Sequence, residues 1–212
     1  MEPAGTAVRR AYDANAERYA SLFLNDLDHD SQTVEALASF AAGVATLPGP
    51  VLDVGCGPGS VVNHLGGVGL DVSGIDLSPG QIEQAHRAYP ERSFAVGDLT
   101  ALDVVDASLG GIVSRYSIIH LDPVVLGAVF AEWFRALQPG APLFVSFFGS
   151  RSPDAHGTPF DHKVVTAYEL DPATVGDLLR DVGFGRIEIV ATPIPEGGRP
   201  FDHTTLLAQK RS

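Results

Sequence analysis

The spacing of apolar residues predicts two helices at the start of the chain. In the first, apolar and aromatic positions recur at intervals of four and three residues, which places them on one helical face. These positions are Tyr12, Ala16, Tyr19 and Phe23. Residues 34–44 repeat the pattern, and the turn formers of residues 48–50 end the second helix.

From residue 51 onward, short apolar runs alternate with helical patterns. The apolar runs predict five buried strands. They cover residues 51–55, 72–76, 93–99, 110–117 and 142–148. This alternation of strands and helices indicates right-handed βαβ units and a parallel sheet. Near-continuous apolar strands agree with this, because parallel strands are covered on both faces.

Helix-starting residues stand between these strands. One helix starts near Gly59. A second is predicted from Pro79 to Ala88, with Ser78 as its N-cap and Gln81 completing a capping-box pattern. A third is predicted for residues 123–137, after an aspartate N-cap at position 122.

The C-terminal part of the chain departs from the alternation. Residues 162–170 allow an extended segment, and Asp171 then opens a helix that Gly183 closes. Two strands follow at residues 186–195 and 203–210, and no helix separates them, so they should be antiparallel neighbours. We therefore expect a doubly wound α/β domain with a seven-stranded sheet. Numbered along the chain, the strands should lie in the order 3-2-1-4-5-7-6, with strand 7 antiparallel.

Composition limits the partners and the location of the protein. With 45% apolar and 19% charged residues, the 212-residue chain is globular and long enough for one domain. Its net charge of −12 disfavours nucleic acid as a partner but leaves small molecules open. The N-terminus lacks the apolar core of a secretion signal, and the longest strongly apolar stretch is too short to span a bilayer. We expect a cytoplasmic protein without a membrane partner; nothing in the sequence decides its oligomeric state.

A glycine-rich turn between the first strand and its helix carries the candidate chemistry. Backbone at Gly55 and Gly57 can approach a ligand closely, and the following helix offers free N–H groups. Asp53 stands inside the first strand, Asp76 ends the second, and Asp98 ends the third. Three successive strands therefore each place a carboxylate at the same edge of the sheet.

Two cofactor classes fit such a turn. A dinucleotide fingerprint would need glycine at position 60, where this chain has Ser60. The three carboxylates instead suit a ligand with an ammonium group, ribose hydroxyls and an adenine amine, rather than a pyrophosphate. The pattern favours S-adenosylmethionine over a nicotinamide cofactor.

The ordered motifs of residues 51–60, 74–85, 96–99, 112–121 and 136–147 resemble those of class I S-adenosylmethionine-dependent methyltransferases. More closely, the chain resembles small bacterial members that act on small molecules, of the ubiquinone-biosynthesis type. The resemblance covers nearly the whole chain and implies a Rossmann-like fold in a single domain, residues 1–212. Within it we expect a helical cap (1–48), a cofactor-binding core (49–149), a lid loop (150–168) and a C-terminal helix with two strands (169–212).

The resemblance also implies a role for individual residues. Asp53 would orient the amino group of the cofactor, Asp76 would hold the ribose hydroxyls, and Asp98 would accept from the adenine amine. Tyr19 would touch the methionine carboxylate. The full implied cofactor-binding set is Tyr19, Asp53, Gly55, Cys56, Gly57, Asp76, Leu77, Gln81, Asp98, Leu99, Ser114, Arg115 and Tyr116.

Several roles stay open at this stage. Arg115 departs from the family pattern, where an apolar or aromatic residue is common, and could pair with an acidic substrate or with a protein carboxylate. His120 could be a general base or a structural residue that bonds a carbonyl. His162 and His203, each preceded by aspartate, lie on segments that could cover the pocket, and His162 is a further candidate base or substrate contact. We interpret Cys56 as a small residue packed near the backbone rather than as a nucleophile. No pair of histidines has the spacing of metal ligands.

The functional expectation is methyl transfer from S-adenosylmethionine to a small molecule by in-line displacement, with S-adenosylhomocysteine as product. The acceptor atom could be O, N, C or S. One alternative is a protein that binds S-adenosylmethionine or S-adenosylhomocysteine without transferring a methyl group. The other is an NAD(P)-dependent oxidoreductase.

Overall fold

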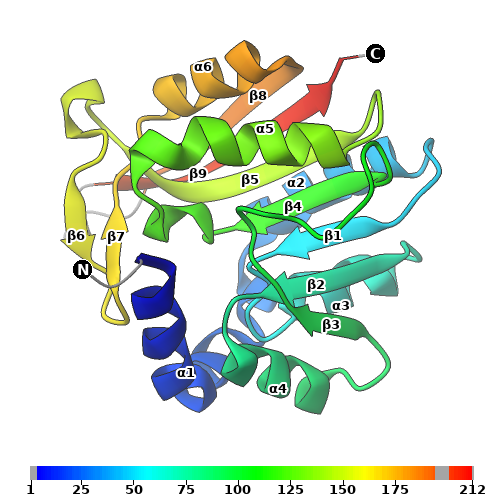
Figure 1. The fold of residues 1–212 in the computed structure, drawn as a ribbon, viewed down its shortest axis with the longest axis vertical. Helices are drawn as coiled ribbons and strands as arrows, with labels where there is room; N and C mark the ends of the chain where they lie inside the picture. The colour runs from blue at the N-terminus through cyan, green and yellow to red at the C-terminus, as the bar shows by residue number, and fades with distance from the viewer. Residues whose placement is uncertain (1–3, 194–200, 212) are drawn as a thin grey trace.

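A seven-stranded sheet runs through the middle of the protein, and helices cover both of its faces (Figure 1). The computed structural model describes residues 4–193 and 201–211. The strands are β1 (Val51–Val54), β2 (Val72–Asp76), β3 (Ser93–Val96), β4 (Gly111–Arg115), β5 (Pro142–Ser150), β8 (Phe184–Thr192) and β9 (Phe201–Lys210). Their order is β3-β2-β1-β4-β5-β9-β8, with β9 antiparallel to both neighbours. This confirms the predicted fold class and strand order.

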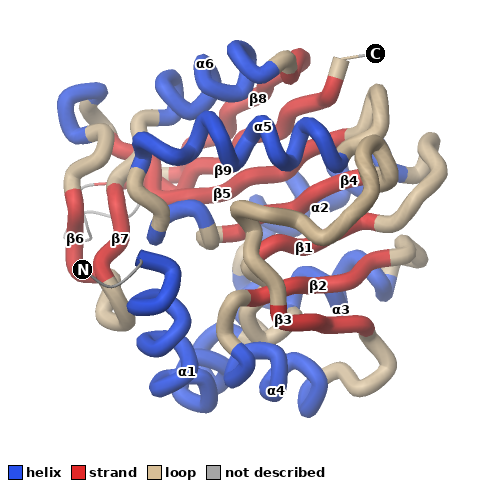
Figure 2. Tube along the Cα trace, in the orientation of Figure 1, coloured by secondary structure: helices blue, strands red, loops and turns tan. Residues whose placement is uncertain are grey.

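Helices form the outer layers of the fold (Figure 2). They are α1 (Ala4–Phe23), α2 (Ser31–Val44), α3 (Ser60–Gly67), α4 (Pro79–Ala88), α5 (Leu126–Ala136) and α6 (Pro172–Val182). Short 3-10 turns lie at η1 (Asp26–His29), η2 (Ile118–His120), η3 (Pro123–Val125) and η4 (Pro153–Ala155). Helices α5 and α6 lie on one side of the sheet, α2 and α3 lie on the other, and α1 packs along α4 (Figure 1).

Strand side chains alternate between two cores. Leu52 and Ile112 pack with Trp133 on the α5 side, while Val51 and Val113 join the core on the α2 and α3 side. The alternation follows from the period of two along a strand, because successive side chains point to opposite faces. Both faces are apolar, as the sequence pattern indicates.

The predicted helix N-caps are confirmed in part. The Ser78 hydroxyl accepts from the Gln81 N–H at 3.1 Å and Pro79 opens α4, as predicted. The reciprocal half of the capping box is absent, because the Ser78 N–H donates to Asp76 Oδ1 instead. Asp122 caps η3 rather than an α-helix, and α5 begins only at Leu126.

Strand ends differ slightly from the sequence expectation. β3 stops at Val96, because Asp98 turns the chain by accepting from the backbone N–H of Thr100 at 2.8 Å. β8 starts at Phe184, two residues before the predicted strand, and residues 194–195 of that prediction lie outside the described residues.

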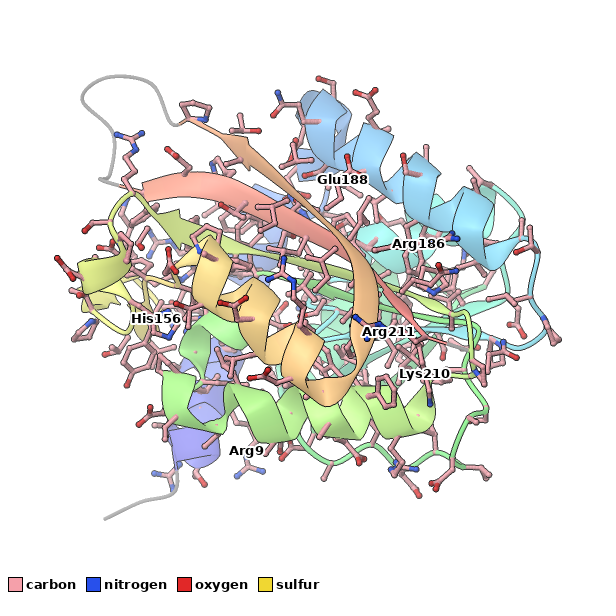
Figure 3. All side chains as sticks on the ribbon, turned by 90° about the horizontal axis from the view of Figure 1, so that it is seen from above. Arg9, His156, Arg186, Glu188, Lys210 and Arg211 are labelled. Atoms are coloured by element: carbon pink, nitrogen blue, oxygen red, sulfur yellow. The ribbon has the colours of Figure 1, made fainter. Side chains whose placement is uncertain are left out.

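The segment predicted as a lid loop contains a small hairpin. β6 (Pro159–Asp161) and β7 (Thr166–Tyr168) pair antiparallel as a separate sheet. The hairpin lies beside the N-terminal helix, as the yellow strands of Figure 1 show. His156, labelled in Figure 3, accepts from the Asp171 N–H at 3.0 Å and links the segment before the hairpin to the start of α6.

The last strand is fastened to α5 as well as to its neighbours. Lys210, labelled in Figure 3, donates its ammonium to the carbonyls of Phe134 and Leu137 at 2.6 and 2.7 Å. These carbonyls lie at the C-terminal end of α5, where a helix has unpaired acceptors and a negative dipole end. The contact holds the C-terminal segment against the α5 layer.

Gly55 makes the turn after β1 possible. Its φ is +77°, and a Cβ built there would overlap the Cβ of Ser117. Any side chain would therefore combine a strained backbone with a collision against the segment that follows β4. The turn and that segment are held in contact because this position has no side chain.

Gly55→Ala and Gly69→Ala separate these two effects. Both glycines have positive φ, but nothing lies within 4 Å of a Cβ at Gly69. We expect Gly69→Ala to cost about 1 kcal/mol of unfolding free energy from backbone strain alone, and Gly55→Ala to cost clearly more. Urea unfolding measures both, and equal losses would show that Ser117 moves aside without cost.

Candidate functional site

Three cavities meet at the carboxyl end of the sheet. The Asp76 cavity, about 270 Å³, is lined by Asp76, Leu77, Asp98 and Leu99 among others. The Asp53 cavity, about 280 Å³, contains Asp53, Cys56, Phe148, His162 and His203. The Phe201 cavity, about 340 Å³, shares Tyr19, Phe148 and His162 with the Asp53 cavity.

The first two cavities are contiguous around the glycine turn. Tyr19, Gly55, Gly57, Arg115 and Tyr116 line both of them. The ends of β1, β2 and β4 therefore open onto one continuous space, with α1 laid across it. Open α/β sheets place ligands at this edge.

Asp76 holds the glycine turn in place. Its Oδ2 accepts from the Gly57 N–H at 2.9 Å, and its Oδ1 accepts from the Ser78 N–H at 2.9 Å. Burial raises the pKa of Asp76, and these two hydrogen bonds oppose the rise. The carboxylate faces the cavity while it organises the backbone beneath it.

Asp53 is a buried carboxyl group without a partner. Only 1% of the residue is exposed, and neither oxygen has a hydrogen-bond partner among the described residues. Burial, with a smaller contribution from the nearby Asp76, raises its pKa to about 8, although Arg115 acts in the opposite direction. A buried polar group without a partner is costly, so this oxygen pair is suited to receive a cationic donor from a ligand.

Cys56 lies between the turn and β2. Burial raises the pKa of its thiol well above the ordinary value, so the thiolate is disfavoured. Its side chain packs against Gly74, where an added Cβ would come within 2.8 Å of the sulfur. This geometry is that of a packing residue next to the turn.

Two predicted residues lie beneath the site rather than on its surface. Ser114 is fully buried, and its hydroxyl bonds that of Ser117 at 2.6 Å. Gln81 is fully buried too, and its amide atoms have no hydrogen-bond partner among the described residues. A Cβ on Gly57 would lie 4.0 Å from the Gln81 oxygen, which places this amide just under the turn.

Arg115 pairs with protein carboxylates, which answers the question that the sequence left open. Its guanidinium lies 2.6 Å from Asp26 and 3.4 Å from Asp30. Both aspartates come from the connection between α1 and α2. The ion pairs fasten this connection to the end of β4.

His120 is engaged at both ring nitrogens. Nδ1 lies 2.9 Å from the Thr166 carbonyl, which can only accept, so Nδ1 carries the proton. Nε2 then accepts from the Tyr12 hydroxyl at 2.8 Å. Burial lowers the pKa of His120, which favours this neutral form. The ring joins α1, η2 and β7, so its structural role is visible in the geometry.

A second tyrosine–histidine pair lies on the other side of the glycine turn. The Tyr116 hydroxyl is 2.5 Å from His203 Nδ1. Tyr116 has a φ of +55°, an uncommon conformation for a bulky residue that is often associated with functional sites. Its ring packs on Phe148 at 4.9 Å, and the His162 ring lies 5.7 Å from Phe148.

Several residues that line these cavities lie outside the predicted site set. They are Tyr12, Asp26, Asp30, Phe148 and Phe201. Tyr12 shares a helical face with Tyr19, which was a usable signal. The partners of Arg115 had none, because 89 and 85 residues separate them from it along the chain.

Among the residues the structure describes, no group of three or more His, Cys, Asp or Glu side chains is arranged to hold a metal ion. Within the same residues, no helix is both long and apolar enough to cross a membrane.

Comparison with known proteins agrees with this geometry. The family described as "Methyltransferase domain" matches residues 51–140. The seven-stranded fold that contains those residues is that of class I methyltransferases. The demethylmenaquinone methyltransferase of Beutenbergia cavernae is 31% identical over 100 residues, which are 47% of this chain. The matched region spans only 41% of that relative.

Solved structures share this fold. Magnesium protoporphyrin IX methyltransferase from Synechocystis PCC 6803, with bound SAM, has a TM-score of 0.75 and 22% identity, covering 99% of this chain and 98% of that one. The [4+2]-cyclase SpnF has a TM-score of 0.69 and 17% identity, covering 85% of this chain and 82% of that one. The fold alone therefore does not decide the reaction.

The residues around the glycine turn fit S-adenosylmethionine. The unpartnered Asp53 carboxyl group beside the glycine turn suits the ammonium group of the cofactor. Asp76 and Asp98 provide acceptor oxygens within the adjoining cavity. The nicotinamide alternative lacks such support, because Ser60 stands where the dinucleotide fingerprint needs glycine and the family match is to methyltransferases.

Asp53→Asn tests the buried carboxyl group through protein stability. A pKa of about 8 in the folded protein, against about 3.9 in an unfolded chain, means that the folded state holds an extra proton between these values. The wild-type protein should therefore lose stability from this group as pH rises from about 4 to about 8, whereas Asp53→Asn should not.

Urea unfolding at pH 5, 6.5 and 8 measures this difference. We expect the stability of Asp53→Asn relative to wild type to increase with pH over this range. Asp177→Asn on the exposed side of α6 controls for the loss of one negative charge. A pH-independent difference between Asp53→Asn and wild type would contradict the burial of an unpartnered carboxyl group.

Proposed function

We propose that this chain transfers the methyl group of S-adenosylmethionine to a small-molecule acceptor. The observation that carries the proposal is the unpartnered, buried Asp53 carboxyl group next to the Gly55–Gly57 turn. It is a costly feature that a bound ammonium group would relieve. The match of residues 51–140 to methyltransferase domains supports the same cofactor.

In this proposal the cofactor lies across the Asp76 and Asp53 cavities. Asp76 receives the ribose hydroxyls and keeps its bonds to the turn, since a carboxylate has acceptor sites for both. Asp98 and the backbone of Leu99 take the adenine edge. Asp53 takes the amino group, and Tyr19 lies at the methionine end with Gly55, Gly57 and the small Cys56. Leu77 flanks the ribose.

When bound, the cofactor supplies a methyl group on a positively charged sulfur, which is already reactive toward a nucleophile. The chain then contributes position and a dry environment. Tyr19 and Tyr116 border both cavities at the turn, so they lie beside the cofactor. Arg115, fastened to Asp26, keeps the connection between α1 and α2 against this junction.

The acceptor side carries the candidate proton-transfer groups. Both ring nitrogens of His120 form hydrogen bonds, one with Tyr12 and one with Thr166. We therefore assign His120 to holding α1 and β7 in place, and not to proton abstraction. His162 and the Tyr116–His203 pair line the Asp53 cavity. Burial lowers the pKa of His203, so its neutral form is available to accept a proton at neutral pH.

One alternative keeps the cofactor and removes the methyl transfer. The similarity in fold to a [4+2]-cyclase is the observation that favours this alternative. Transfer of a labelled methyl group from S-adenosylmethionine to a product distinguishes the two functions. A protein that binds S-adenosylhomocysteine but transfers no label to any small-molecule fraction would support the alternative.

Cofactor binding is tested by isothermal titration with S-adenosylhomocysteine. We expect Asp76→Ala to weaken binding by roughly tenfold or more, since hydrogen bonds to a charged group are lost. Asp71→Ala, an exposed carboxylate just before β2, is the matched control and should bind as wild type. Absence of binding by folded wild-type protein, or equal binding by both variants, would reject the proposal.

Proton release provides an independent test of the Asp53 assignment. With a pKa of about 8, roughly nine-tenths of this group is protonated at pH 7. An incoming ammonium group favours the carboxylate, so binding should expel close to one proton that Asp53→Asn does not release. Titrations at pH 7 in buffers of different ionisation enthalpy measure this, and identical release by wild type and Asp53→Asn would exclude the contact.

A further inference from the structure

The Phe201 cavity has an aromatic wall. Phe148 and Phe201 pack at 4.7 Å between ring centroids, and the His162 ring lies 5.7 Å from Phe148. Tyr19 and Phe23 pack at 4.5 Å on the α1 side of the same space. Two ring clusters therefore face one cavity from elements far apart in the sequence.

Exposed apolar side chains continue this wall toward solvent. Leu22 is 61% exposed and Phe23 is 38% exposed, and both line the Phe201 and Asp53 cavities. Adjacent large apolar residues left in water beside a cavity indicate a surface for an apolar ligand body.

The edge of the cavity carries positive charge. Arg18 on α1 and Lys163 in the turn between β6 and β7 line it, and both are exposed. Neither has an ion pair among the residues the structure describes, and no carboxylate there lines this cavity. Asp161 lies nearby, but its carboxylate accepts from the backbone N–H of Lys163 at 2.7 Å.

This placement is unusual for a chain whose net charge is −12. The hairpin that carries Lys163 lies beside α1, which carries Arg18 (Figure 1). Two cations thus stand at the opening of an aromatic cavity on an otherwise acidic protein. Arginine and lysine are the side chains that recognise carboxylate, sulfonate and phosphate groups.

We propose that the Phe201 cavity binds the methyl acceptor, and that the acceptor is an amphipathic anion with an aromatic or extended apolar body. The body lies against Phe148 and Phe201, and the acid group is held by Arg18 and Lys163. This inference rests on the proposed function, because Phe148, His162 and Tyr19 connect the cavity to the Asp53 cavity beside the cofactor.

Two fluorescent probes with one shared body test the proposal. 8-Anilino-1-naphthalenesulfonate carries a negative charge, whereas N-phenyl-1-naphthylamine has the same rings without it. Both are titrated into the full chain saturated with S-adenosylhomocysteine at low ionic strength, where exposed charges are least screened. We expect the anionic probe to bind more tightly than the neutral one.

A double variant tests the cations. Arg18→Gln with Lys163→Gln should weaken binding of the anionic probe by roughly fivefold and leave the neutral probe within about twofold of wild type. Arg87→Gln with Arg180→Gln removes the same charge from α4 and α6, where each arginine pairs within its own helix. This control double variant should bind both probes as wild type does.

A second double variant tests the apolar surface. Leu22→Gln with Phe23→Gln should weaken both probes by a similar factor, because the body loses contact area. These residues are exposed, so the variant should fold as wild type. Unchanged affinity for both probes in this variant would overturn the proposal.

Two further results would also reject it. One is equal affinity of wild type for both probes, and the other is an equal effect of the cation variant and its control. S-Adenosylhomocysteine binding is measured in the same samples. If S-adenosylhomocysteine binds but the protein binds both probes equally, the acceptor class is wrong and the proposed function stands. If S-adenosylhomocysteine does not bind, the proposed function fails.

Discussion

The double hydrogen bond of Asp76 is the contact on which the site depends. One carboxylate accepts from Gly57 in the turn after β1 and from Ser78 at the start of α4. Ser78 in turn donates its hydroxyl to Asp13 at 2.6 Å, and Asp13 accepts from the Gly80 N–H at 3.0 Å. The chain of contacts joins turn, strand, helix and N-terminal cap. The covering helix is therefore placed by the same groups that shape the cofactor cavity.

The site places carboxyl groups close together without giving them an ion pair of their own. Asp53 is buried and Asp76 is half-buried. Asp76 contributes to the raised pKa of Asp53, and both carboxyl groups contribute to the raised pKa of Cys56. Arg115 is close enough to lower the pKa of Asp53, but its ion pairs are with Asp26 and Asp30. Uncompensated carboxyl groups of this kind are kept where a ligand supplies the missing donor. A positively charged cofactor would satisfy them.

The two halves of the site have different origins in the chain. The family match ends at residue 140 and includes the strands and turns that line most of the Asp76 cavity. The described residues that line the Phe201 cavity all lie outside that match, in α1, at the end of β5, in the β6–β7 hairpin or in β9. If the Phe201 cavity binds the acceptor as proposed, this division explains why the match to methyltransferase domains identifies the cofactor and does not identify the acceptor. The same division accommodates different reactions on one fold.

The sequence alone determined the strand order, the glycine turn and the acids on successive strands. These features depend on period, capping and handedness, which act over a few residues or within one βαβ unit. Only the tertiary structure decided the partners of Arg115 and His120, the unpartnered state of Asp53, and the meeting of Arg18 with Lys163 at one cavity. Those contacts join segments far apart along the chain, and their geometry depends on how α1 and the hairpin pack across the end of the sheet. No local pattern encodes such a packing, because each contact is fixed by two segments that specify their own conformations independently.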